Sequence, residues 1–227
     1  MAPPPLVTGL TAERVRANLR EVQDEIAAAA RVSGRTPEDV ELLAAVKYVA
    51  TEELGTLVEA GLTLFGENRA QQLEEKHAAL GPDAPVTCDF IGQLQSRKVK
   101  AIAPLVRRIH SVASDSALAQ LAKHGHDALE IFVEVNVAEE EGKAGIAPAD
   151  LAAFAERAAA AGFPPKGLMT MPPRAETAED SRRWFAAARE LAHAHGLHGL
   201  SMGTTQDFAV AVEEGATCVR VGSRLYR

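Results

Sequence analysis

A lysine stands near the end of an apolar run in the segment ELLAAVKYVA, residues 41–50. Lysine side chains are rarely fully buried unless they are paired or used in chemistry. One interpretation is that the stem of Lys47 lies along apolar surface while its ammonium group reaches water. The other is that desolvation in a pocket makes the amine a nucleophile that forms a Schiff base with a carbonyl compound. The run by itself leaves both interpretations open.

Two loops rich in glycine and hydroxyl groups follow apolar runs near the end of the chain. The segment VRVGSRLYR has Gly222 and Ser223 after its apolar run. The segment SMGTTQDF has Ser201, Gly203 and Thr205 at the corresponding place. Such loops present backbone N–H and hydroxyl donors to an anion, which predicts a phosphate site. A simple turn followed by a helix N-cap is the alternative.

Arg220 alternates with Val219 and Val221, so we expect its side chain to point into the interior of the fold. A buried guanidinium needs a partner. A structural ion pair, for example with Glu134, is one possibility, and a contact with a ligand is the other.

The elements that position these residues follow a regular alternation. Short runs rich in Val, Ile and Phe predict eight strands, at residues 41–47, 62–66, 88–92, 108–112, 130–136, 166–171, 199–203 and 218–222. The segments between them predict helices at residues 51–60, 67–80, 95–105, 115–125, 148–161, 176–195 and 206–214, with an extra helix at 11–32. This pattern indicates an α/β fold, a (β/α)8 TIM barrel. A doubly wound open sheet is the alternative, but no glycine-rich fingerprint follows an early strand.

We expect a single barrel domain over residues 10–227 and disorder in the proline-rich residues 1–9. Functional side chains of such barrels gather at the C-terminal ends of the strands, and the residues named above lie there. A Schiff-base lysine, a phosphate site and an inward arginine together suggest pyridoxal 5′-phosphate (PLP).

Composition limits the classes of partner. The chain has 24 Lys and Arg against 31 Asp and Glu, a net charge of 24 − 31 = −7, which argues against binding to nucleic acid. Cys88 and Cys218 lie in strand-like segments and are interpreted as buried small side chains, and no Cys/His cluster predicts a metal site. The start of the sequence lacks a signal-peptide pattern, and no run of about eighteen apolar residues predicts a membrane span. We therefore expect a cytoplasmic protein.

Six segments carry a resemblance to a known family, in chain order: LLAAVKYVATEEL, LFGENRAQQLEEK, DFIGQLQSRKVK, VEVNVAEEEGKAGI, KGLMTMPP and LSMGTTQDFAVAVEEGATCVRVGSRLY. As a set they resemble the successive motifs of the pyridoxal-phosphate homeostasis proteins and, more distantly, the barrel domain of alanine racemase. The resemblance spans nearly the whole chain and implies a fold-type III PLP barrel.

The resemblance also implies roles for individual residues. Lys47 matches the Schiff-base lysine, Asn68 lines the cofactor pocket, and Arg220 matches the arginine that faces the pyridine nitrogen. The residues implied to surround the rest of the cofactor are Lys143, Met171, Ser201, Gly203, Thr205, Gly222 and Ser223. The sequence departs from the family after SMG, where Thr204 and Thr205 replace the usual Met-Ser pair.

Three functions are compatible with these residues. The resemblance implies a PLP-binding protein that buffers or delivers the cofactor, as a monomer, to apo-enzymes. A PLP-dependent racemase is the alternative, but it needs a base on each face of the substrate, and alanine racemase takes its second base from a β domain without counterpart in this sequence. A Schiff-base aldolase without cofactor is the third, although its lysine would typically stand on a later strand than the first.

Overall fold

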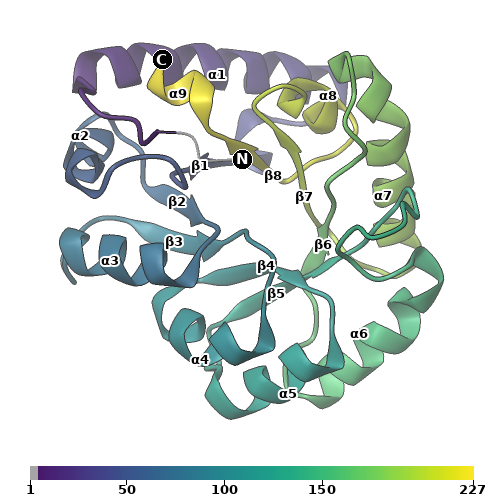
Figure 1. Ribbon diagram of the computed structural model, residues 1–227. Coiled ribbons are helices and arrows are strands. Elements are labelled where there is room, and N and C mark those ends of the chain that lie inside the picture. The colour runs from purple at the N-terminus through teal and green to yellow at the C-terminus, as the bar shows by residue number, and fades with distance from the viewer. Residues whose placement is uncertain (1–4) are drawn as a thin grey trace.

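The computed structural model describes residues 5–227 and contains a closed barrel of eight parallel strands surrounded by helices (Figure 1). The strands follow one another around the barrel in chain order, and β1 pairs with β8 to close it. The strands are β1 Glu41–Ala45, β2 Leu64–Glu67, β3 Thr87–Phe90, β4 Arg108–Val112, β5 Glu130–Glu134, β6 Gly167–Met169, β7 Gly199–Thr204 and β8 Cys218–Val221. The predicted (β/α)8 barrel is confirmed.

The helices form the outer ring in Figure 1. They are α1 Ala12–Val32, α2 Leu54–Glu59, α3 Ala70–Leu80, α4 Val99–Ile102, α5 Asp115–His124, α6 Leu151–Ala160, α7 Arg182–Ala194, α8 Phe208–Glu213 and α9 Ser223–Tyr226. Short 3-10 helices lie at Pro37–Asp39, Thr51–Glu53, Ser96–Lys98, Ala103–Leu105, Pro148–Asp150 and Ala178–Ser181. None of the helices within residues 5–227 has the length and apolar character needed to cross a bilayer.

The predicted extra helix, α1, joins the start of the chain to its end. The Thr11 hydroxyl caps it by accepting a hydrogen bond from the Arg14 N–H. Val15, Leu19 and Val22 recur at helical spacing and are buried. This face packs against α2, α8 and α9, as the top of Figure 1 shows.

The chain before α1 is held against the loop that follows β1. The predicted disorder of residues 1–9 falls partly on residues 1–4, which lie outside the described residues. Val7 donates a hydrogen bond to the Tyr48 carbonyl over 2.7 Å and accepts one from the Ala50 N–H over 3.1 Å. These two bonds form an isolated parallel bridge, so the expectation of disorder does not hold for this part of the segment.

Several predicted elements end earlier than expected. β1 ends at Ala45 and β6 at Met169, and beyond β5 the chain pairs Val135 with Ile146 of its own following loop. The helix predicted at 95–105 is divided into α4 and two 3-10 helices, and the second of these, Ala103–Leu105, contains Pro104, which has no N–H to donate. The strand ends are therefore followed by short turns that carry the mouth residues.

The interior of the barrel is filled by complementary large and small residues. The Leu43 side chain occupies the space beside Gly66, where an added Cβ would lie 2.1 Å from the leucine Cδ2. Phe132 fills the corresponding space beside Gly199. Around these residues the barrel interior is thus a packed core and not a pore.

Gly203 lets β7 approach α8, and replacing it by alanine should destabilise the fold. Its φ is +88°, and an added Cβ would lie 2.5 Å from the Ala211 Cβ. We expect the free energy of unfolding to fall by about 2–5 kcal/mol, the sum of the left-handed backbone and overpacking costs. Gly162 is the matched control: its φ is +90° but an added Cβ meets nothing within 4 Å, so alanine there should cost only about 1–2 kcal/mol. Urea denaturation measures both, and equal losses would contradict the close packing at Gly203.

Candidate functional site

Lys47 lies in the turn after β1, two residues beyond Ala45, where the strand ends. The Val46 N–H donates to the Gly66 carbonyl over 3.0 Å, which keeps the start of this turn attached to β2. The Lys47 side chain is partly buried, and its Nζ lies 5.1 Å from the centre of the Tyr48 ring. In the described part of the chain this Nζ makes no hydrogen bond or ion pair, so the amine is available to a ligand.

A buried ion pair supports the Lys47 turn from below. Lys76 Nζ lies 2.6 Å from Glu67 Oε2 and donates to the Val46 carbonyl over 2.5 Å. Both charged side chains are almost fully buried. Sequence reasoning missed this role of Lys76, although its position three residues after the buried Leu73 lies on the apolar face of α3.

Asn68 is positioned by its backbone. Its N–H donates to Glu67 Oε1 over 2.7 Å, and Gly92 packs so closely that an added Cβ would lie 2.1 Å from the Asn68 carbonyl oxygen. The amide side chain of Asn68 makes no hydrogen bond to the described residues. It is free to contact a ligand beside the strand end.

Arg220 points into the barrel, as its alternation with two valines predicts, and is 5% exposed. Its Nη1 donates to Ser201 Oγ over 2.5 Å, and its Nη2 donates to the Thr170 carbonyl over 3.1 Å and to Met171 Sδ over 2.9 Å. Burial lowers the pKa of Arg220 below its ordinary, very high value. The guanidinium still remains charged at neutral pH, since that ordinary value is so high.

The ion pair between Arg220 and Glu134 that we considered from the sequence does not form. No carboxylate within residues 5–227 pairs with this guanidinium. Burial raises the pKa of Glu134, and the charge of Arg220 only opposes that shift. A buried cation without an acidic partner is the feature that an acceptor from a ligand would satisfy.

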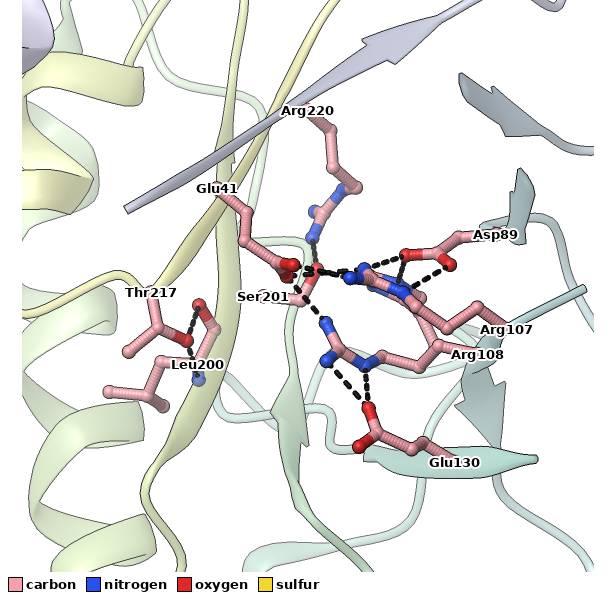
Figure 2. Close-up of polar contacts among 10 residues, drawn as sticks. Glu41, Asp89, Arg107, Arg108, Glu130, Leu200, Ser201, Thr217 and Arg220 are labelled. Atoms are coloured by element: carbon pink, nitrogen blue, oxygen red, sulfur yellow. Dashed lines mark hydrogen bonds and ion pairs between the residues drawn. The ribbon is translucent and has the colours of Figure 1, made fainter. Parts of the chain in front are cut away.

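Ser201, His110 and Asp89 continue from Arg220 as a chain of hydrogen bonds across the barrel interior. Ser201 Oγ lies 2.8 Å from His110 Nδ1, and His110 Nε2 lies 3.0 Å from Asp89 Oδ2. All three side chains are buried. Figure 2 shows Arg220 reaching toward Ser201, with Asp89 beside Arg107, the residue that precedes β4.

Ion pairs extend this series of hydrogen bonds to the opposite end of the barrel. Arg107 bonds both Asp89, over 2.7 Å, and Glu41. Arg108 bonds Glu41 over 2.7 Å and Glu130 over 2.6 Å (Figure 2). Positive and negative groups therefore alternate toward the N-terminal ends of the strands.

The protonation of His110 follows from its surroundings. Burial lowers the pKa of His110, although the hydrogen bond to Asp89 opposes this, so the ring is neutral at pH 7. Burial would raise the pKa of Asp89, but hydrogen bonds from His110 and Arg107 bring it below the ordinary value, so the carboxylate is ionised. Matching donors with acceptors then places the ring proton on Nε2, which donates to Asp89. The unprotonated Nδ1 accepts a hydrogen bond from the Ser201 hydroxyl.

The phosphate contact predicted for Ser201 is not supported by this geometry. Its hydroxyl is directed into the barrel and is occupied by His110 and Arg220, so it does not face the loops at the mouth. Sequence reasoning also missed His110 and Asp89. Their signal was the two-residue period of β4 and β3, in which an ionisable side chain occupies an inward position.

The two loops predicted to hold a phosphate do lie side by side. The Gly222 N–H donates to Thr205 Oγ1 over 2.9 Å, and this serine- and threonine-bearing junction continues into the exposed Ser223. Gly222 also approaches the first barrel strand, where an added Cβ would lie 3.5 Å from the Ala45 carbonyl oxygen. The junction and the Lys47 turn thus adjoin at the point where the barrel closes. Gly203 lies outside it and serves the approach of α8.

Met171 and Lys143 lie at the rim. Met171 is 49% exposed and contacts Arg220 through its sulfur. Lys143 pairs with Glu140 and donates to the Pro172 carbonyl over 3.1 Å. Both line a cavity of about 990 Å³ that Lys47 and Asn68 do not reach. The predicted residues accordingly form one group at the barrel closure and a second at the adjoining rim.

The comparison with known proteins agrees with this geometry. The model of the family described as alanine racemase, N-terminal domain, matches residues 12–227, and the barrel is of that class. Proteins named pyridoxal phosphate homeostasis protein are 38% identical in Pseudomonas aeruginosa and 36% identical in Aquifex aeolicus, each over 218 residues. These alignments cover 92% of this chain and 93% and 95% of the respective relatives. The chain belongs to the family of pyridoxal phosphate homeostasis proteins, which confirms the resemblance inferred from its motifs.

A solved structure of the same kind carries the cofactor. PipY of Synechococcus elongatus PCC7942, with PLP bound, is 30% identical, has a TM-score of 0.74, and is matched over 89% of this chain and 100% of PipY. The fold of this chain is therefore one on which a relative binds PLP.

Removing the ammonium group of Lys76 should destabilise the protein, because the Glu67 carboxylate would stay buried without a cation. We expect Lys76→Met to lower the free energy of unfolding by about 3–5 kcal/mol. The double variant Lys76→Met/Glu67→Gln should recover most of this loss, since no unpaired charge remains buried. Lys100→Met, on the exposed side of α4, is the control and should change the value by less than about 0.5 kcal/mol. Urea denaturation of the four proteins measures the effect, and a loss as small as that of the control would contradict the buried pair.

Proposed function

We propose that this protein binds pyridoxal 5′-phosphate through a Schiff base on Lys47 and takes part in PLP homeostasis by buffering or delivering the cofactor, without strong turnover. The observation that carries the proposal is the closure of the barrel, where β1 and β8 are neighbours. That closure brings the turn of Lys47 next to the Gly222–Ser223 turn, which follows the strand of Arg220. Within residues 5–227 the Lys47 amine has no partner and Arg220 has no acidic partner. The name of the relatives and the PLP-bound PipY structure support it.

The residues present fit this cofactor. A guanidinium has five N–H groups, and three of those of Arg220 have partners, so 5 − 3 = 2 remain for a ligand. A pyridine nitrogen is an uncharged acceptor that suits such a donor. The hydroxyls of Thr205 and Ser223, beside Gly222, suit a phosphate group.

When bound, the cofactor supplies an aldehyde, which condenses with the Lys47 amine to form a C=N bond and release water. Arg220 has no proton to give at neutral pH, and its charge disfavours a second positive charge on the ring nitrogen. An unprotonated ring is a weak electron sink. This property favours holding the cofactor over catalysing reactions with it.

The remaining residues would complete the site. Asn68 offers a side-chain amide without partners, and Met171, through its contact with Arg220, is suited to pack against the ring. Lys143 would contribute positive charge near the phenolic oxygen. Its present partners, Glu140 and the Pro172 carbonyl, would keep it at the rim.

No observation favours the racemase alternative. The chain has two tyrosines, Tyr48 and Tyr226. Tyr226 is buried and its hydroxyl has no partner, and burial raises its pKa, so it is a poor base. Tyr48 lies beside Lys47 itself. A base on the opposite face of the substrate is therefore not evident among these residues.

The proposal includes apo-enzymes as recipients, a monomeric state and a cytoplasmic location. Cys88 and Cys218 are free thiols, as is usual in a reducing compartment.

Reduction with borohydride should fix PLP covalently on Lys47. Mass spectrometry of the digested protein would then find the added mass on the peptide that contains Lys47. Lys47→Ala should abolish both the adduct and the absorbance band of the Schiff base, because no other amine occupies this turn. Lys100→Ala, on the exposed side of α4 and outside the site, is the control and should retain both. An adduct that persists in Lys47→Ala would refute the assignment.

The loaded protein should restore activity to an apo form of a PLP-dependent enzyme. The Schiff base is reversible, and Met171 and Tyr48 at the mouth are both substantially exposed, so release does not require unfolding. Protein that has been reduced with borohydride is the control, because its cofactor can no longer leave. Recovery of activity with the loaded protein alone is expected. No recovery would mean that the protein retains the cofactor without delivering it.

A further inference from the structure

We propose that Ser201 and His110 are positioning residues for Arg220, and that their hydrogen-bond chain, anchored on Asp89, holds the guanidinium in the orientation in which it meets a ligand at the barrel mouth. The inference rests on the proposed function, because the ligand it concerns is the ring nitrogen of PLP. It assigns a role to three buried side chains that do not themselves contact PLP in the proposed site.

Ser201 provides the firmest of the three contacts that fix the guanidinium. It is the only side-chain oxygen among them, at 2.5 Å from Nη1, and a hydrogen bond from a charged donor is stronger than one between neutral groups. The Met171 sulfur is a weak acceptor on a half-exposed side chain. The Thr170 carbonyl fixes only Nη2. Without Ser201, the Nη1 end of Arg220 would therefore lose its fixed partner.

His110 determines how the Ser201 hydroxyl is turned. Its unprotonated Nδ1 attracts the hydroxyl proton, which leaves a lone pair of Ser201 Oγ facing Arg220. Asp89 fixes this arrangement because it accepts the Nε2–H and is itself held by Arg107. Each donor in the chain meets one acceptor, so the polarity runs in a single direction from Arg220 to Asp89.

The chain holds the cation without neutralising it. A carboxylate in direct contact would also orient Arg220, but it would cancel much of the positive charge that acts on the ring nitrogen. Here two neutral groups, Ser201 and His110, separate Arg220 from Asp89. The guanidinium is thereby fixed in place while its charge stays directed at the mouth.

The same three residue types form the catalytic triad of serine hydrolases, but nucleophilic catalysis does not fit these three. Ser201 is fully buried, and its lone pair is occupied by Arg220. The hydroxyl therefore has no approach for a substrate, and a positioning role remains.

A double-mutant cycle on PLP affinity tests the inference. Ser201→Ala should raise the dissociation constant of PLP about tenfold, the lower end of the loss typical for residues that act through another. In an Arg220→Ala background, the same Ser201→Ala change should alter it by less than about twofold, because the residue through which it acts is gone. Ser111→Ala removes another buried hydroxyl, which bonds the Gly92 carbonyl and takes no part in the hydrogen bonds from Arg220 to Asp89. This change should leave the affinity unchanged.

Two substitutions of His110 give an independent measurement. His110→Leu should weaken PLP binding as Ser201→Ala does, whereas His110→Gln should restore it, because its amide can accept from Ser201 and donate to Asp89. The melting temperature of each cofactor-free protein is recorded alongside, since a purely structural role would lower stability without coupling to Arg220. If His110→Leu does not fold, the Ser201 cycle decides.

Additive losses for Ser201→Ala and Arg220→Ala would overturn the inference while leaving PLP binding by the wild-type protein intact. An unchanged affinity in Ser201→Ala would overturn it as well. A wild-type protein that takes up no PLP would instead contradict the proposed function, and the inference with it.

Discussion

The burial of one guanidinium inside the barrel is the constraint on which the interior depends. Moving a charged group out of water costs several kcal/mol, and Arg220 has no carboxylate in contact to offset it. The interior meets this cost with a polar chain that ends in ions near the opposite face. Three cations and three anions alternate there, for a net charge of 3 − 3 = 0: Arg220, Arg107 and Arg108 against Asp89, Glu41 and Glu130. The charges of this network thus balance across the core, although Arg220 at its upper end has no carboxylate in direct contact among the described residues.

The closure of the barrel converts this interior into a site. Because β1 and β8 pair in register, with Leu43 opposite Arg220, the turn of Lys47 and the turn of Gly222 emerge at the same edge. The Lys47 turn is secured from three directions: by the Gly66 carbonyl, by Lys76 from α3, and by the chain before α1. A nucleophilic lysine needs a fixed backbone more than a fixed side chain, since its amine must reach the ligand. The structure has this combination.

The sequence predicted the parts of the fold that follow a periodic residue pattern. It did not predict the features that depend on contacts between residues far apart in the chain. The eight strands and the inward direction of Arg220 follow from alternation, and Lys47 from an unusual residue in an apolar run. The direction of the Ser201 hydroxyl could not be predicted, because a serine at a strand end looks the same whether its hydroxyl faces a loop or the interior. His110 and Asp89 were missed because their partners are distant in the chain, 91 residues for His110 and Ser201. Local patterns contain no such information.

The division between rigid and exposed parts suits the proposed role of holding a cofactor without catalysing reactions with it. The groups that would set the electronic state of the ring nitrogen lie on strands and are buried, so they cannot readily change partners during a reaction. The groups around the open side, Met171, Tyr48 and Ser223, are exposed. Catalysis with PLP needs acid–base groups arranged around a sequestered substrate, and an unprotonated ring nitrogen makes the cofactor a weaker electron sink. This barrel has a fixed, buried cation in Arg220 and exposed groups around its mouth, an arrangement that favours the proposed reversible capture.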